Sequence, residues 1–256
     1  MLRVRLALAL TLAGTPACLL LSDLDRLSAF TDAAPVDGGA EGGAGSLVDE
    51  AGDAPACDHA ICEDFDDDAA LSRWILTRSG DSPPLFGVDT RASTTPPRSF
   101  FYEAAEPVRY GTTTSLSRVV AVGETGGLTC TFDLRFDAFD GSFPIVFSLG
   151  TEGASATLSL EELNGNLNVV EEPSSTTATT DITLSPGAWT KITTTLVRAP
   201  ALGFTVSDGF HTKTIAPQPW PAATAFRASF GLVFSRFATD ERKGAARVDT
   251  IRCDVL

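Results

Sequence analysis

Apolar and polar side chains alternate in several short segments of the chain. The clearest is 128–137, in which the even-numbered positions are apolar and the odd-numbered positions are polar or charged. This period of two residues is that of a β-strand with one side in a core and the other in solvent. Similar patterns predict further strands at 115–122, 143–149, 157–160, 167–170, 189–197 and 226–234.

Turn-forming residues separate these segments. They occur at 126–127, 140–141, 164–165, 186–187 and 208–209, and each pair includes a glycine. No convincing amphipathic helix interrupts the series. Many short strands at regular spacing predict an all-β fold, namely a two-sheet antiparallel β-sandwich of the jelly-roll type.

The N-terminus has the order of a secretory signal. Arg3 and Arg5 precede an apolar run at 6–13, and small residues follow as far as Ala17. The run is shorter than the roughly 20 apolar residues of a membrane span. We therefore expect a signal peptide at 1–17. Cleavage after it would leave Cys18 as the first residue, which resembles a bacterial lipoprotein, whose N-terminal cysteine carries lipid. Ordinary secretion after the same cleavage is the alternative.

The number of cysteines supports the lipoprotein interpretation. The chain has five cysteines. In an exported, oxidising setting four of them can form two disulfides, and these are Cys57, Cys62, Cys130 and Cys253. Cys18 is left over at the cleavage point, which favours acylation of its thiol. We expect the protein to be exported across the cytoplasmic membrane and lipid-anchored to the cell envelope.

Residues 18–56 have a different composition from the rest of the chain. Aspartate and glutamate alternate there with glycine and alanine, and Arg26 is the only base. Such a segment buries too little apolar surface to fold, which predicts a flexible acidic tether. The whole chain has a formal charge of −14. This charge argues against nucleic acid as a partner and against a membrane contact other than the lipid anchor.

The segment 57–68 combines two cysteines, His59 and several aspartates. The cysteines are too far apart for a Cys-x-x-Cys redox pair, and the second histidine, His211, is distant in the sequence. Asp64, Asp66 and Asp68 match the start of an EF-hand, but positions six and twelve of that loop are Ala69 and Ile75. We predict no metal or other cofactor, with calcium at the rim of the sandwich as the alternative. The segment is interpreted as a clasp in which Cys57 and Cys62 close a small loop before the first strand and the aspartates are solvated.

Three segments together resemble a known superfamily. They are 186–197, which includes Trp189, 203–209, which ends in Asp-Gly, and 246–252, which contains Val-Asp-Thr-Ile. These segments are similar to strands of the concanavalin A-like lectin/glucanase superfamily, in particular of LamG-like jelly rolls. The resemblance covers about 57–256, the predicted domain. It implies that the last strand lies beside 128–137, where Cys130 and Cys253 both face the core and would form a disulfide. The main rival is Cys62 with Cys253.

Many members of this superfamily are glycoside hydrolases or lyases. A glycosidase needs two carboxyl groups across a cleft, and the Glu-x-Asp-x-x-Glu strand motif of one hydrolase family does not occur here. The pairs 161–162 and 171–172 would point to opposite faces of their strands. Asp133 and Asp137 share a face, but Arg135 between them favours ionisation of both. We predict no catalytic residue.

A binding role is predicted from one aromatic residue. Trp220 lies in Pro217-Gln-Pro-Trp-Pro221, where its ring is placed to stack on a sugar. The structural alternative is that it closes one end of the sandwich, and Trp74 and Trp189 are assigned to the core. The sequence thus favours a non-catalytic module on the cell envelope that binds a glycan or another envelope component. The alternatives are a carbohydrate-active enzyme, either glycoside hydrolase or lyase, with an unrecognised site, and a purely structural envelope lipoprotein.

Overall fold

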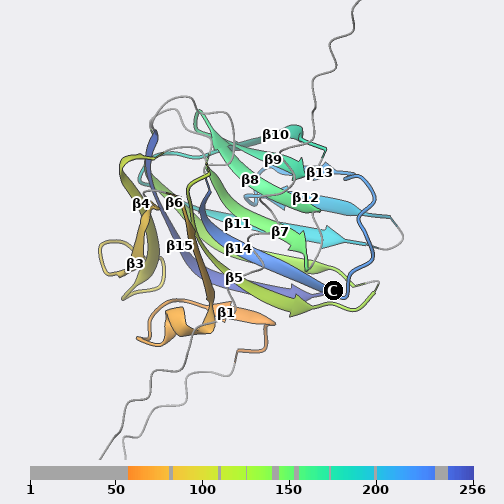
Figure 1. Cartoon of the computed structure of the whole chain (residues 1–256), viewed down its shortest axis with the longest axis horizontal. Helices are drawn as coiled ribbons and strands as arrows, with labels where there is room; N and C mark the ends of the chain where they lie inside the picture. Colours follow the sequence, from red (N-terminus) through yellow and green to blue (C-terminus); the bar gives the residue numbers. More distant parts are fainter. Residues whose placement is uncertain are drawn as a thin grey trace, which may run out of the picture. The chain divides into compact units, whose positions relative to one another are not determined.

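Two antiparallel β-sheets form the domain in a computed structural model of the chain (Figure 1). The structure describes residues 57–80, 83–108, 111–124, 126–139, 144–152, 156–172, 174–198, 201–233 and 242–256. The predicted signal peptide, Cys18 and the tether lie outside these ranges. Within them, no helix is long and apolar enough to cross a membrane.

One sheet has eight strands and the other seven. The eight-stranded sheet contains β1 (Ile61–Glu63), β3 (Leu85–Asp89), β4 (Ser99–Val108), β6 (Leu128–Phe139), β11 (Trp189–Val197), β12 (Gly203–Ser207), β13 (Thr212–Ile215) and β15 (Arg242–Val255). The seven-stranded sheet contains β2 (Ile75–Ser79), β5 (Thr113–Ala121), β7 (Ile145–Thr151), β8 (Thr157–Leu163), β9 (Asn166–Glu172), β10 (Thr176–Thr183) and β14 (Ala225–Val233). A short 3-10 helix, Ala70–Arg73, precedes β2. The predicted all-β sandwich is confirmed.

The core lies between the two sheets. Phe132 of β6 belongs to the eight-stranded sheet, while Phe147 of β7 and Phe230 of β14 belong to the other. The three rings are fully buried, and their centroids lie 5.0 to 5.1 Å apart. Each ring comes from the apolar side of an alternating strand, so the alternation seen in the sequence directs these side chains inward.

Both predicted disulfides are present. Cys130 of β6 and Cys253 of β15 are direct cross-strand partners, with both side chains buried. Cys57 is bonded to Cys62, the middle residue of β1. The rival pairing of Cys62 with Cys253 does not occur. The last strand lies beside β6, as the superfamily resemblance implied.

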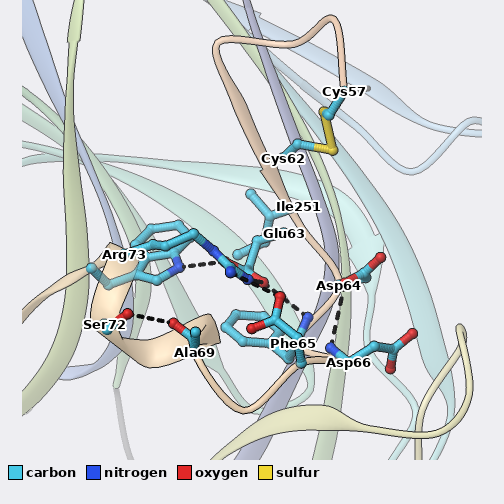
Figure 2. A network of polar contacts seen from close by, with 12 residues as sticks. Cys57, Cys62, Glu63, Asp64, Phe65, Asp66, Ala69, Ser72, Arg73 and Ile251 are labelled. Carbon is cyan, nitrogen blue, oxygen red and sulfur yellow. Dashed lines mark hydrogen bonds and ion pairs between the residues drawn. A yellow bond between two sulfur atoms is a disulfide. The ribbon is translucent and has the colours of Figure 1, made fainter. Parts of the chain in front are cut away.

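The clasp at the start of the domain is held by a buried carboxylate (Figure 2). Glu63 accepts hydrogen bonds from Nε and Nη2 of Arg73 at 3.0 and 2.7 Å. It also accepts from the backbone N–H of Phe65 and from Nε1 of Trp74, each at 3.1 Å. Four donors on one carboxylate offset the loss of its hydration. The chain is thereby fixed between β1 and β2.

Three aspartates of the clasp form ion pairs or hydrogen bonds, whereas the aspartates were predicted only to be solvated. Asp67 forms an ion pair with Arg73 at 2.8 Å, and Asp68 forms one with Arg98 at 2.5 Å. Asp66 accepts a hydrogen bond from the backbone N–H of Arg98. The prediction missed these contacts because Arg98 is distant in the sequence. The two contacts with Arg98 join the clasp to the start of β4.

Candidate functional site

A row of small polar side chains crosses the outward face of the seven-stranded sheet. The register pairs Ser159 of β8 with Ser148 of β7, Ser148 with Ser229 of β14, and Ser229 with Ser117 of β5. Directly paired residues of an antiparallel sheet project from the same face. The neighbouring positions on β14, such as Phe230, fill the core. We call these four residues the serine row.

Polar side chains beside the serine row are buried although they face away from the core. Glu161 of β8 is paired with Asn168 of β9, and their exposed fractions are 5% and 2%. Ser117 and Ser159 of the row itself are 2% and 3% exposed. Buried polar groups on an outward face are informative because burying them costs free energy unless they have partners.

The side chain of Asn168 has a hydrogen-bond donor without an acceptor among the described residues. The Nδ2 atom of Asn168 is buried and has no hydrogen-bond partner among the residues that the structure describes. Its neighbour on the next strand is the carboxyl group of Glu161, and Thr179 of β10 lies on its other side. An unsatisfied buried amide is rare in native proteins, so it points to a role for the group.

On the other side of the serine row lies an arginine. Arg227 of β14 forms a two-point ion pair with Glu152, at 3.0 Å from Nε and 2.8 Å from Nη2. Its Nη1 donates to Ser117 Oγ at 3.2 Å. Gly150 of β7 is its cross-strand partner and has no side chain to cover it. The face thus presents hydroxyl, amide, carboxylate and guanidinium groups in adjacent rows, which suits a ligand rich in hydroxyl and carboxylate oxygens.

The candidate residues named from the sequence are not brought together on this face. Trp220 is partly buried and packs edge-on against the core ring of Phe226, with a centroid distance of 6.1 Å. Its role in ligand binding stays a prediction. Cys57, Cys62, Cys130 and Cys253 form the disulfides.

The histidines lie apart from one another. His59 contacts Asp254 at 2.7 Å, and His211 contacts Asp208 at 3.1 Å in the turn after β12. The described residues contain no group of three or more histidine, cysteine, aspartate or glutamate side chains that could hold a metal ion.

The serine row and Asn168 were not predicted from the sequence. The outward residues of β14, Arg227 and Ser229, alternate with buried phenylalanines, and this pattern does identify them as outward-facing. What it does not indicate is that four serines from four strands form one row. That fact depends on the order β8, β7, β14, β5 in the sheet.

No protein-family model and no curated protein matches the chain. The structure of endo-β-1,4-glucuronan lyase from the fungus Trichoderma reesei is similar at 11% identity and a TM-score of 0.56, over 77% of this chain and 95% of that one. Cellulose-induced protein Cip1 is similar at 16% identity and a TM-score of 0.57, over 75% and 96%. Alginate lyase A1-II′, of polysaccharide lyase family 7, is similar at 11% identity and a TM-score of 0.51, over 72% and 95%.

These similarities show the fold, which is a concanavalin A-like jelly roll. They also contradict the expectation of a non-catalytic module, because several of the similar structures are polysaccharide lyases. The findings favour the alternative, a carbohydrate-active enzyme. The expectation was wrong because it tested the sequence for the paired carboxylates of hydrolysis, which is not the only way to cleave a polysaccharide.

Proposed function

We propose that the protein is a carbohydrate-active enzyme that cleaves a polysaccharide bound on the outward face of the seven-stranded sheet. The observation that carries this proposal is the buried pair Glu161 and Asn168 next to the serine row. The serine hydroxyls supply donors and acceptors for sugar hydroxyls. The lyases that share the fold support the reaction class.

The positions of the carboxylates favour elimination over hydrolysis. Glu161 and Glu172 are outward-facing on β8 and β9, and Glu172 is paired with Thr157, four residues before Glu161. At about 3.4 Å per residue, this offset along the strands separates the two backbone positions by roughly 13 Å. The two carboxyl groups of a glycosidase are about 5 to 9.5 Å apart. We therefore propose a lyase that acts on a uronate polysaccharide.

In such an elimination a base removes the proton from the carbon that bears the sugar carboxylate. A double bond forms between this carbon and the next ring carbon as the bond from that ring carbon to the glycosidic oxygen breaks. The proton taken up by the base is then delivered to the departing oxygen. Negative charge accumulates on the sugar carboxylate and must be stabilised. We assign the unused Nδ2–H of Asn168 to that carboxylate and the base to Glu161, its neighbour.

Two isosteric variants test the assignment. Glu161→Gln removes the base, and Asn168→Asp replaces the donor with an acceptor that repels the sugar carboxylate. We expect each to lower the cleavage rate about a hundredfold or more. The measurement is the formation of unsaturated sugar ends from alginate and glucuronan, followed by ultraviolet absorbance and mass spectrometry.

Glu124→Gln, an exposed position after β5, is the matched control and should cleave like the unaltered protein. Normal cleavage by both isosteric variants would show that this face is not the site. Saturated products carrying an added water would show hydrolysis and overturn the lyase assignment.

We propose further that the enzyme is exported and held at the cell envelope through lipid on Cys18, and that its domain belongs to the LamG-like type. Support comes from the apolar run at 6–13, the unpaired Cys18 after it and the quoted motifs. The acidic segment 18–56 would then separate the domain from the membrane.

The proposed lipid anchor on Cys18 can be tested separately. Intact-mass analysis of membrane-extracted protein should show a chain that begins at Cys18 and carries acyl groups. Cys18→Ala should release the protein from the membrane fraction, while Cys57→Ser with Cys62→Ser should leave it there. A soluble, unmodified Cys18 in the unaltered protein would exclude the anchor.

A further inference from the structure

Trp189 lies on the outward face of the eight-stranded sheet, so its predicted place in the core was wrong. It is the cross-strand partner of Arg135 on β6, whose neighbours Leu134 and Phe136 fill the core. Its side chain is half-buried. The other outward positions of β11 with the same parity include Thr193 and Thr195. A threonine suits such a surface, so a half-exposed tryptophan needs another explanation.

Arg135 is held in place by a hydrogen bond from one of its guanidinium nitrogens. Its Nε donates to Asp137 Oδ1 at 2.5 Å. The other oxygen of Asp137 accepts from Nε of Arg247 at 2.8 Å, and Arg247 Nη1 donates to Asp89 at 2.6 Å. In the described part of the chain, neither Nη atom of Arg135 has a hydrogen-bond partner. The guanidinium is therefore fixed on one side and open on the other.

A second aromatic residue of the same face provides a contrast. Phe101 of β4 lies across from Arg247, and the guanidinium groups of Arg91 and Arg247 lie 5.1 and 5.8 Å from its ring centroid. Its ring is thus engaged by two cations. Trp189 has no ring or cation stacked on it among the described residues. Of the two aromatics, only Trp189 has a ring free to stack on a ligand.

The turn before β11 passes beside Arg135. Gly187 lies in this turn with φ of 76°, and a Cβ built on it would lie 3.9 Å from Nη2 of Arg135. The turn therefore passes close to the guanidinium without a side chain that covers it. Lys191, the next outward residue of β11, is exposed and adds a positive charge.

We propose that Trp189 and Arg135 form a second glycan-binding site, specific for acidic sugar units, on the outward face of the eight-stranded sheet. The indole ring stacks on the apolar face of a pyranose. The open side of the guanidinium binds the sugar carboxylate with two parallel N–H donors. The site rests on the proposed function only for the class of polysaccharide, because it shares no residue with the proposed catalytic face. It would hold the polymer while another part of it is cleaved.

Affinity electrophoresis of the full chain in gels that contain alginate tests the proposal. Trp189→Ala and Arg135→Gln should each weaken binding about tenfold, equivalent to about 1.4 kcal/mol, whereas Trp189→Tyr should retain most of it. Binding to hydroxyethylcellulose, a neutral polymer, should be weaker and insensitive to Arg135→Gln. Equal binding to both polymers would overturn the assignment to acidic sugars. Thermal unfolding of each variant establishes that it is folded.

Two comparisons separate this site from the catalytic face. Asn168→Asp should lower the cleavage rate about a hundredfold or more, as above, yet keep the Trp189-dependent binding. The binding result can therefore be interpreted even if the lyase proposal fails. Phe101→Leu should bind like the unaltered protein. Unchanged binding in a folded Trp189→Ala variant, or an equal loss in Phe101→Leu, would overturn the assignment to Trp189.

Discussion

Buried carboxylates in this domain differ in how many donors they have. Glu63 has four hydrogen-bond donors in the clasp. Glu162 has one, the backbone N–H of Gly165 at 2.5 Å, and its Oε2 atom is buried with no partner among the described residues. Burial raises the pKa of Glu162 above its ordinary value. Burial of the charged carboxylate therefore costs more free energy at Glu162 than at Glu63.

Replacement of Glu162 should change the pH dependence of stability. Because the pKa of Glu162 is raised in the folded state, the folded protein binds the carboxyl proton more tightly than the unfolded chain does. The free energy of unfolding therefore falls as the pH rises above about 4.3, the ordinary pKa of glutamate. We expect Glu162→Gln to be more stable than the unaltered protein at pH 7, by on the order of 1 kcal/mol. Chemical denaturation at several pH values checks this.

The advantage of Glu162→Gln should shrink as pH falls toward 4, where the native carboxyl group also becomes neutral. Asp181→Asn, an exposed position on β10, is the control and should show no such trend. An equal effect of Glu162→Gln at all pH values would mean that charge is not the cause.

At the scale of elements, strand β15 joins the parts of the eight-stranded sheet. It pairs with β6 along one side, and with β4 and then β1 along the other. The disulfide from Cys253 to Cys130 joins it covalently to β6, across 123 residues of sequence. The disulfide from Cys57 to Cys62 spans only 5 residues and constrains β1 alone. The two bonds should therefore differ in their effect on stability.

Removal of each disulfide tests this difference. In the chain-entropy model a closed loop of this length contributes between 4 and 5 kcal/mol, and a loop of a few residues about 2 kcal/mol. Cys130→Ala with Cys253→Ala should lower the free energy of unfolding by about 4 kcal/mol or more, since a buried site also loses packing. Cys57→Ser with Cys62→Ser should lower it by about half as much. Equilibrium unfolding in urea measures both, and a larger loss from the short loop would contradict the role given to β15.

At the scale of the whole domain, the two outward faces differ in chemistry. The seven-stranded sheet presents buried polar groups, such as Asn168, beside the serine row. The eight-stranded sheet also has buried outward polar groups, such as Asp249, and it presents threonine pairs that hydrogen-bond across strands, including Thr129 with Thr195 at 2.9 Å, and the proposed site at Trp189. One sandwich can therefore carry two unlike sites, because its alternating strands leave both outer faces free while their other sides form a shared core.

Local sequence patterns were sufficient to predict the fold class, the strand at 128–137 and the inward direction of its apolar side. They also indicated the Cys57–Cys62 bond. These features depend on local alternation and spacing, which a single segment displays. The Cys130–Cys253 pair needed strand parity together with the superfamily resemblance. The assignment of Trp189 to the core failed because the apolar character of one residue does not reveal which face of its strand it occupies.

Which residues lie next to one another across strands depends on the folded chain. The serine row takes one residue from each of four strands, and Arg135 meets Trp189 across a pairing of two distant segments. The two proposed sites follow from strand order and register, which are set by the packing of all the strands around one core. No short segment contains that information. For this reason the sequence predicted the sandwich, whereas the polar groups on its faces became visible only in the folded chain.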